Sequence, residues 1–79
     1  MRISYSFHAK RRMEQRGISR SDLEYLLSKR QLVGTPDKHP GRMKYTGTLQ
    51  DGRRIVMVIA PPLEETGPYT VITTFGIEG

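Results

Sequence analysis

Residues 6–18 read SFHAKRRMEQRGI and predict one basic helix of about ten residues, around which we expect the fold to be arranged. Ser6 is a suitable N-cap, because its hydroxyl can accept a hydrogen bond from a free backbone N–H of the first turn. Gly17 stands where a left-handed residue would end the helix. At roughly 100° per residue, Ala9 and Met13 share a narrow apolar stripe. Because so narrow a stripe cannot stabilise a helix alone, we expect this helix to dock on a larger element.

The remaining surface of this helix carries cations. His8, Arg12 and Arg16 recur at every fourth position and share one ridge, which Arg11 flanks. His8 is the one side chain of the stretch that titrates near neutrality. The spacing therefore predicts a helix with one narrow apolar side and one broad cationic side.

Length and composition set the class of protein. With 79 residues the chain is expected to be a single domain, 1–79, which buries only about 60 to 65% of the surface of the unfolded chain. The chain has no cysteine, so disulfides and thiolate metal sites are excluded. No apolar run reaches the roughly 20 residues of a membrane span, and the N-terminus lacks the apolar core of a signal peptide. We expect a soluble, cytoplasmic protein that does not enter the membrane.

The charge is concentrated in the first part of the chain. The net charge is +5, from thirteen Lys and Arg against eight Asp and Glu. Residues 1–30 hold eight bases and three acids, which gives the whole excess of +5, whereas residues 31–79 hold five of each. This asymmetry predicts an anionic partner. The alternative is a solvated helix face that only keeps a small protein in solution.

A second helix is predicted directly after the first. Ser19 is followed three residues later by Asp22, which is the reciprocal capping pattern, and Ile18 can pack against the first turn. The apolar spacing at i, i+3, i+4 and i+7 is carried by Leu23, Leu26, Leu27 and Arg30.

The rest of the chain predicts strands. Residues 2–5 indicate a short extended lead-in. Residues 34–41 are dense in turn formers and predict a loop. Residues 43–49, which follow it, predict a half-buried strand. Asp51-Gly52 favours a two-residue type I′ hairpin turn.

Two further strands complete the expected sheet. Residues 54–60 are apolar on both faces and predict a central strand, and residues 69–75 predict a third strand. The fold class is therefore α+β, with two N-terminal helices packed on an antiparallel β-meander of at least three strands. Since a strand apolar on both faces needs cover on both, a homodimer is one way to bury the second face.

Several kinds of chemistry lack their residues. No clustered His or carboxylate pattern supplies metal ligands, no serine sits in a glycine-bracketed elbow, and no glycine-rich phosphate loop is present, so we expect no metal and no cofactor. What remains is cationic chemistry on a phosphodiester, which needs a base, an acid and cations that stabilise the transition state. The candidate catalytic residues are His8, Arg12, Lys44 and Tyr45.

The candidate nucleic-acid contacts are basic side chains of the first helix and of the sheet, namely Lys10, Arg11, Arg12, Arg16, Arg42 and Arg53. Each has a structural alternative. His8 could bond the backbone of its own turn, and Arg12 and Arg16 could form surface ion pairs with Glu14, Asp22 or Glu24. Tyr45 could serve core packing alone.

The motifs His8-Ala9, Arg12-Met13 and Arg16-Gly17-Ile18-Ser19, followed by GRMKYTG, GRRIVMVI and VITTF, resemble a bacterial domain-of-unknown-function family. The family is similar in layout to the RelE-like and BrnT-like ribonuclease toxins. The resemblance covers nearly the whole chain. It implies a toxin-like fold and a suspected endoribonuclease activity centred on the first helix and the sheet edge.

These observations leave three functions open. The first is a small RNA-binding protein that cuts RNA without metal in the manner of a toxin. The second is a nucleic-acid-binding module without catalysis. The third is a protein-interaction subunit that pairs with an acidic antitoxin-like partner.

Overall fold

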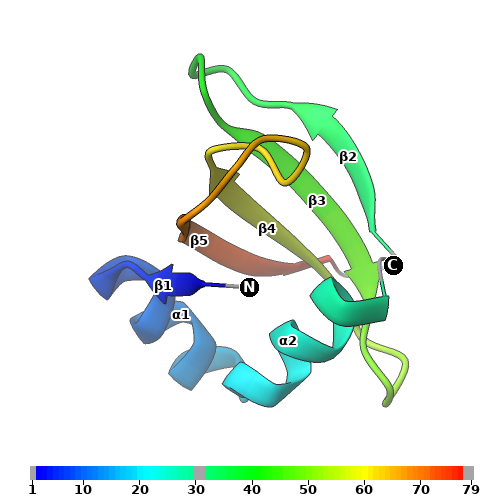
Figure 1. Cartoon of the computed structure of the whole chain (residues 1–79). Coiled ribbons are helices and arrows are strands. Elements are labelled where there is room, and N and C mark those ends of the chain that lie inside the picture. The colour runs from blue at the N-terminus through cyan, green and yellow to red at the C-terminus, as the bar shows by residue number, and fades with distance from the viewer. Residues whose placement is uncertain (1, 30–31, 78–79) are drawn as a thin grey trace.

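The computed structural model describes residues 2–29 and 32–77. In order along the chain, these residues form β1 (Ile3–Tyr5), α1 (Phe7–Arg16), α2 (Arg20–Lys29), β2 (Val33–Pro36), β3 (Met43–Thr48), β4 (Arg54–Ala60) and β5 (Tyr69–Ile77). The strands form one five-stranded sheet in the order β1-β5-β4-β3-β2. Both helices lie on the same side of this sheet (Figure 1). The α+β class and the two N-terminal helices packed on a sheet are confirmed.

The sheet is mixed, so the expectation of a purely antiparallel meander is corrected. β3, β4 and β5 do form an antiparallel meander. β1, however, pairs with β5 in parallel, with Ile3 opposite Tyr69 and Tyr5 opposite Val71. The pairing continues at both ends of β1, where the Tyr69 N–H donates to the Arg2 carbonyl and the Ser6 N–H donates to the Val71 carbonyl, each at 3.0 Å. The expected lead-in is therefore an edge strand.

A second edge strand lies within the segment expected to be a loop. Val33–Pro36 pairs antiparallel with β3, and Gly34 lies opposite Tyr45. A Cβ at position 34 would lie 3.0 Å from a carbon of the Tyr45 ring, so a glycine allows the strand to approach. The prediction that residues 34–41 form a loop was wrong for the first three of them, because an edge strand needs hydrogen bonds on one side alone and tolerates Pro36 at its end.

The hairpin between β3 and β4 also differs from the expectation. The Gly52 N–H donates to the Leu49 carbonyl at 2.9 Å, and the Leu49 N–H donates to the Arg53 carbonyl at 2.7 Å. The loop therefore holds three residues, 50–52, and Gly52 takes the left-handed conformation with φ 92°. Asp51 stabilises this turn, because its Oδ1 accepts the Arg53 N–H at 3.0 Å. A three-residue loop that ends in a left-handed glycine is the next most common hairpin after the two-residue turn that was predicted.

The helix ends follow the sequence signals. The Ser6 hydroxyl accepts the Ala9 N–H at 3.0 Å, and Gly17 is left-handed with φ 63°. Ser19 and Asp22 exchange hydrogen bonds of 2.8 and 3.1 Å before α2. The predicted Arg30 position lies outside the described residues. No described helix is long and apolar enough to span a membrane.

β4 is the central strand, as predicted, and its two faces differ. Ile55, Met57 and Ile59 belong to the core beneath the helices, where they join the buried side chains of α1 and α2. Val56 and Val58 alternate with them on the second face, which no described helix covers. We call this second side of the sheet the open face. Its exposed apolar side chains include Phe75, which lies opposite Val56.

Candidate nucleic-acid interface

The outer surface of α1 combines an aromatic ring with cations. Ala9 and Met13 are buried, and α1 packs against β5, so the opposite side of the helix faces solvent. Phe7 is 75% exposed there. The guanidinium carbon of Arg11 lies 5.9 Å from the centroid of the Phe7 ring, and Lys10 is exposed in the same turn. An exposed ring among cations is the combination that single-stranded nucleic acids bind, because bases stack on the ring while phosphates meet the charges.

Phe7 is a candidate that the sequence reasoning missed. A pattern of charges does not include an aromatic residue, and an aromatic residue in a small protein usually belongs to the core. A signal was nevertheless present. Phe7 lies four residues before Arg11 and outside the stripe of Ala9 and Met13, so helical spacing alone places it on the solvent side.

His8, Arg12 and Arg16 all lie within α1 at every fourth position, so they form the predicted ridge. His8 and Arg16 are exposed, and Arg12 is half-buried. Neither arginine forms an ion pair with Glu14, Asp22 or Glu24, since the ion pairs among the described residues join Lys44 to Asp37 and Arg53 to Asp51. Carboxylates of the described residues thus leave the cations of α1 available to an external anion.

Arg53 fastens the end of α1 to the β3–β4 hairpin. Its Nη1 donates to the Arg16 carbonyl at 2.6 Å, and its Nη2 donates to the Gly17 carbonyl at 3.2 Å. Its Nε donates to Asp51 Oδ2 at 2.7 Å. Carbonyls at the end of a helix lack partners within the helix, so this guanidinium supplies donors that the fold needs. Arg53, predicted as a nucleic-acid contact, therefore has a structural role of its own.

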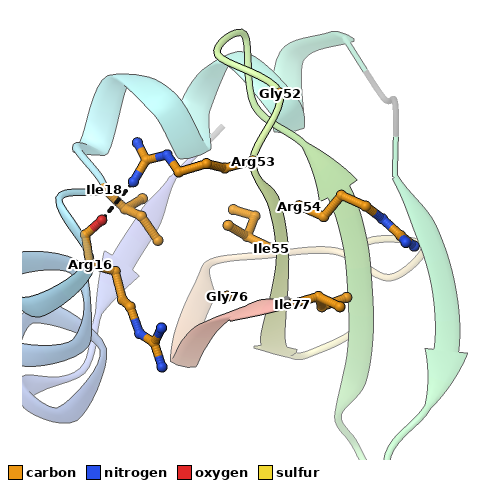
Figure 2. Close-up of a pocket in the computed structure, with 8 residues that line it drawn as sticks. All are labelled: Arg16, Ile18, Gly52, Arg53, Arg54, Ile55, Gly76 and Ile77. Atoms are coloured by element: carbon orange, nitrogen blue, oxygen red, sulfur yellow. Dashed lines mark hydrogen bonds between the residues drawn. The ribbon is translucent and has the colours of Figure 1, made fainter. Parts of the chain in front are cut away.

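A cavity of about 380 Å³ opens beside this contact, where α1 ends and β5 leaves the core. We call it the Arg16 cavity. Figure 2 shows the Arg16 side chain beside Gly76 on one side and Arg54 extending away from it toward β3 and β2. The described residues that line it are Arg16, Ile18, Gly52, Arg53, Arg54, Ile55, Gly76 and Ile77. Cations and isoleucines make up most of this lining, and none of these eight residues is acidic.

Lys44 and Tyr45, the predicted catalytic residues of the sheet, point to opposite faces because they are neighbours on β3. The Lys44 Nζ lies 3.8 Å from Asp37 Oδ1. Tyr45 is 3% exposed, donates its O–H to Glu64 Oε2 at 2.9 Å and accepts the Leu63 N–H at 2.8 Å. Burial raises the pKa of Tyr45 to about 12, the Leu63 N–H opposes this rise, and Glu64 adds to it.

The described residues do not bring these side chains to His8. α1 packs on β5, whereas β3 lies on the far side of β4 and its side chains are held by Asp37, Leu63 and Glu64. The catalytic assignments of His8, Arg12, Lys44 and Tyr45 remain predictions.

The basic residues predicted to bind nucleic acid fall into two groups. Lys10, Arg11, Arg12 and Arg16 lie on α1, and Arg53 lies at its end. Arg42 precedes the first residue of β3, at the opposite end of the β3–β4 hairpin from Arg53. It is therefore separate from the others. Among the described residues, no group of three or more His, Cys, Asp or Glu could hold a metal ion.

The fold and this surface together define a small α+β domain whose first helix is cationic and docks on the last strand of a mixed sheet. A family model described as Domain of unknown function (DUF4258) matches residues 5–75, and the chain belongs to this family. No curated protein and no solved structure matched the chain. The resemblance to a domain-of-unknown-function family is thus confirmed. The likeness to RelE-like and BrnT-like toxins stays a prediction.

Proposed function

We propose that the protein binds single-stranded RNA through the outer surface of α1. The observation that carries the proposal is the exposed ring of Phe7 beside Arg11, on a helix whose cations are not ion-paired with described carboxylates. The residues of this surface are Phe7, Lys10, Arg11, Arg12 and Arg16.

Single-stranded rather than double-stranded RNA fits the aromatic residue. In a duplex the faces of the bases are stacked on each other, whereas in a single strand they are free to stack on a side chain. The cations neutralise phosphates and release counterions, which supplies affinity without reading the sequence. The cytoplasmic location expected from the lack of cysteine is compatible with an RNA partner.

The protein is also a candidate to cleave the RNA that it binds. A metal-independent cut would use His8 as the base that deprotonates the 2′-hydroxyl and Arg12 as a cation at phosphorus. The hydrogen bonds and ion pairs of Lys44 and Tyr45 join them to Asp37, Leu63 and Glu64, and Tyr45, with a pKa of about 12, holds its proton tightly. We therefore put binding before cleavage. Labelled RNA incubated with the protein in excess chelator decides between them, since a toxin-like endoribonuclease leaves a 2′,3′-cyclic phosphate and loses activity in His8→Ala.

The binding test uses fluorescence anisotropy of a labelled single-stranded RNA at several salt concentrations. Arg11→Ala should reduce the magnitude of the log–log salt slope by about one, because one phosphate contact is lost. Phe7→Ala should weaken binding without changing this slope, because the ring carries no charge. Arg42→Ala is the matched control, because it also removes one positive charge. Arg42 lies away from α1, at the end of the β3–β4 hairpin opposite to Arg53. Equal effects of Arg42→Ala and Arg11→Ala, or no salt dependence, would contradict the proposal.

An acidic antitoxin-like partner is the second candidate, and a separate observation favours it. The open face presents Phe75 at 38% exposure and Val33 at 69% exposure, with the cations Lys44 and Arg54 on the same face. Phe75→Asp, which puts a negative charge on this face, should abolish binding of such a partner, whereas the RNA-binding surface on α1 is not altered. If the protein instead forms a homodimer through this face, the same substitution should convert the dimer to a monomer in a sedimentation experiment on the protein alone.

A further inference from the structure

We infer that the Arg16 cavity holds one nucleotide of the bound strand, with the base against its isoleucines and the phosphate at Arg16. The inference rests on the proposed RNA binding and adds a defined subsite to it. The α1 surface supplies a path for the strand, whereas the cavity supplies a half-open recess for a single unstacked base.

The size and floor of the cavity suit a base. Its volume of about 380 Å³ falls within the range of small-molecule pockets, roughly 300 to 1,000 Å³. Its lining includes the half-buried Ile77, on the same face of the sheet as Arg54, together with Ile18 and Ile55, which are 5% and 1% exposed. A base placed there would be removed from water. In a single strand this base is not paired within a duplex, so it loses no duplex stacking when it enters the cavity.

The rim suits a phosphate. An ideal Cβ at position 76 would lie 3.7 Å from the Arg16 Nη1, so the glycine leaves open the space next to this guanidinium. Arg53 lies across the cavity and is bonded to the carbonyls of Arg16 and Gly17. These bonds place positive charge where the negative end of the helix dipole would otherwise repel an anion.

The backbone of β5 can supply hydrogen bonds to the base. β1 pairs with β5 only from Tyr69 to Val71, and no described strand pairs with the same edge beyond that point. Along an unpaired edge, alternate residues direct their N–H and C=O groups away from the sheet. Gly76 and Ile77 line the cavity within this segment, so the Watson–Crick edge of a base would meet backbone donors and acceptors.

The cavity also lies where the strand would arrive. Arg16 is the last residue of the ridge that begins at His8 and continues through Arg12. A strand whose phosphates follow this ridge reaches the Arg16 side chain at the mouth of the cavity. One surface thus leads directly into the other.

The experiment follows the amide resonances of ¹⁵N-labelled protein during titration with adenosine 5′-monophosphate, adenosine or inorganic phosphate. Adenosine 5′-monophosphate should shift the amides of Gly52, Ile55 and Gly76, with an affinity at least tenfold higher than that of either fragment. Equal affinities for the nucleotide and inorganic phosphate would reduce the cavity to an anion site and overturn the inference, and so would shifts confined to α1.

Gly76→Val tests the cavity without removing a charge. The added methyl groups occupy the space beside Arg16, and Gly76 does not have a positive φ. We expect the nucleotide shifts to disappear and the affinity for the RNA oligomer to fall at least fivefold. The magnitude of the salt slope should fall by up to about one, because the phosphate at Arg16 is displaced together with its base. Thr73→Val is the matched control, since it places valine on the same strand opposite Val58, on the open face. Gly76→Ala fills less of the space, and it replaces Gly76→Val if the larger variant does not fold.

The two proposals fail in different ways. If Phe7→Ala and Arg11→Ala weaken RNA binding while Gly76→Val does not, the cavity holds no nucleotide and the α1 surface remains the binding site. If the protein binds no RNA but the nucleotide still shifts Gly52 and Gly76, the proposed function is wrong and the cavity is a nucleotide site in its own right.

Discussion

Tyr45 shows how one residue can connect three parts of the molecule. Its ring lies in the core and contacts the space kept open by Gly34 of β2. Its hydroxyl bonds both Leu63 and Glu64 of the loop between β4 and β5. A half-buried loop that follows a central strand needs such partners, because its backbone N–H groups would otherwise be unsatisfied.

Tyr45→Phe should lower stability in a pH-dependent way. At pH 8 the Leu63 N–H loses its acceptor, so we expect the free energy of unfolding to fall by about 1 to 2 kcal/mol. In the parent, the pKa of Tyr45 is raised to about 12, so the stability that its protonated form contributes is complete below about pH 10 and is lost as the pH rises through 12. The difference between parent and variant should therefore narrow across this window.

Urea denaturation at intervals between pH 8 and 12 measures this effect. Tyr25→Phe, which removes a hydroxyl from α2, is the control for the general loss of stability in alkali. A constant difference between parent and Tyr45→Phe over the whole range would show that the Tyr45 hydroxyl is not protected in the folded protein.

At the residue scale, the sequence predicted which charged residues share one side of α1, but it did not predict which distant residues the charged side chains contact. The ridge of His8, Arg12 and Arg16 needs only the helical period, which local signals establish. The structural role of Arg53 depends on the end of α1, 37 residues away in sequence, and nothing near position 53 indicates it. The separation of Lys44 and Tyr45 from His8 likewise depends on the order of the strands.

At the scale of elements, local signals predicted helices and long-range pairing determined the edges of the sheet. Ser6, Gly17, Ser19 and Asp22 each act within a few residues, so both ends of α1 and the start of α2 could be predicted. β1 and β2 have three and four residues and owe their extended form to β5 and β3. Short edge strands carry too few residues for a period to be visible.

Ser6→Ala should destabilise the protein more than an ordinary surface serine substitution does. The Ser6 hydroxyl accepts the Ala9 N–H at the start of α1 and donates to the Ile72 carbonyl at 2.5 Å. It therefore serves as a cap and as a tie between α1 and β5, and its loss should cost about 1 to 2 kcal/mol. Ser21→Ala, in the exposed first turn of α2, should cost less than about 0.5 kcal/mol. Similar costs in chemical denaturation would contradict the double role of Ser6.

Arg53→Lys should loosen the end of α1. A lysine keeps the charge but lacks the planar fork that reaches both the Arg16 and Gly17 carbonyls. We expect a loss of about 1 kcal/mol and faster amide hydrogen exchange in the last turn of α1. Arg54→Lys, on the other face of β4, is the control. Unchanged exchange at residues 14–17 would show that the hairpin does not hold the helix.

At the scale of the whole molecule, the sheet is covered on one side by two helices and uncovered on the other within the described residues. The apolar pattern of β4 predicted cover on both faces, and the structure shows it on one. Val56 and Val58 are nonetheless only 7% and 5% exposed, because neighbouring strands shield them. Burial by neighbours in a sheet is a property of the assembled sheet that no single strand reveals.

Two matched substitutions compare the faces. Val71 is 0% exposed in the core beneath the helices, so Val71→Thr buries a hydroxyl there and should cost about 1 to 3 kcal/mol. Val56→Thr makes the same chemical change on the open face, next to Thr46, and should cost less than about 1 kcal/mol. Thermal and urea unfolding at two protein concentrations measure both. If Val56→Thr is as costly as Val71→Thr, and stability rises with concentration, a second copy covers the open face in solution.

The parallel pairing of β1 with β5 has a consequence for synthesis on the ribosome. The hydroxyl of Ser6 and the carbonyl of Ile72 are 66 positions apart in sequence, and α1 docks on the same last strand. A nascent chain therefore produces its cationic helix early and the strand that supports it late. Because so narrow an apolar stripe gives α1 little stability alone, the core can close only after residues 69–77 have left the exit tunnel. Folding of this domain thus waits for the synthesis of β5, its last strand, and the domain then folds as one unit.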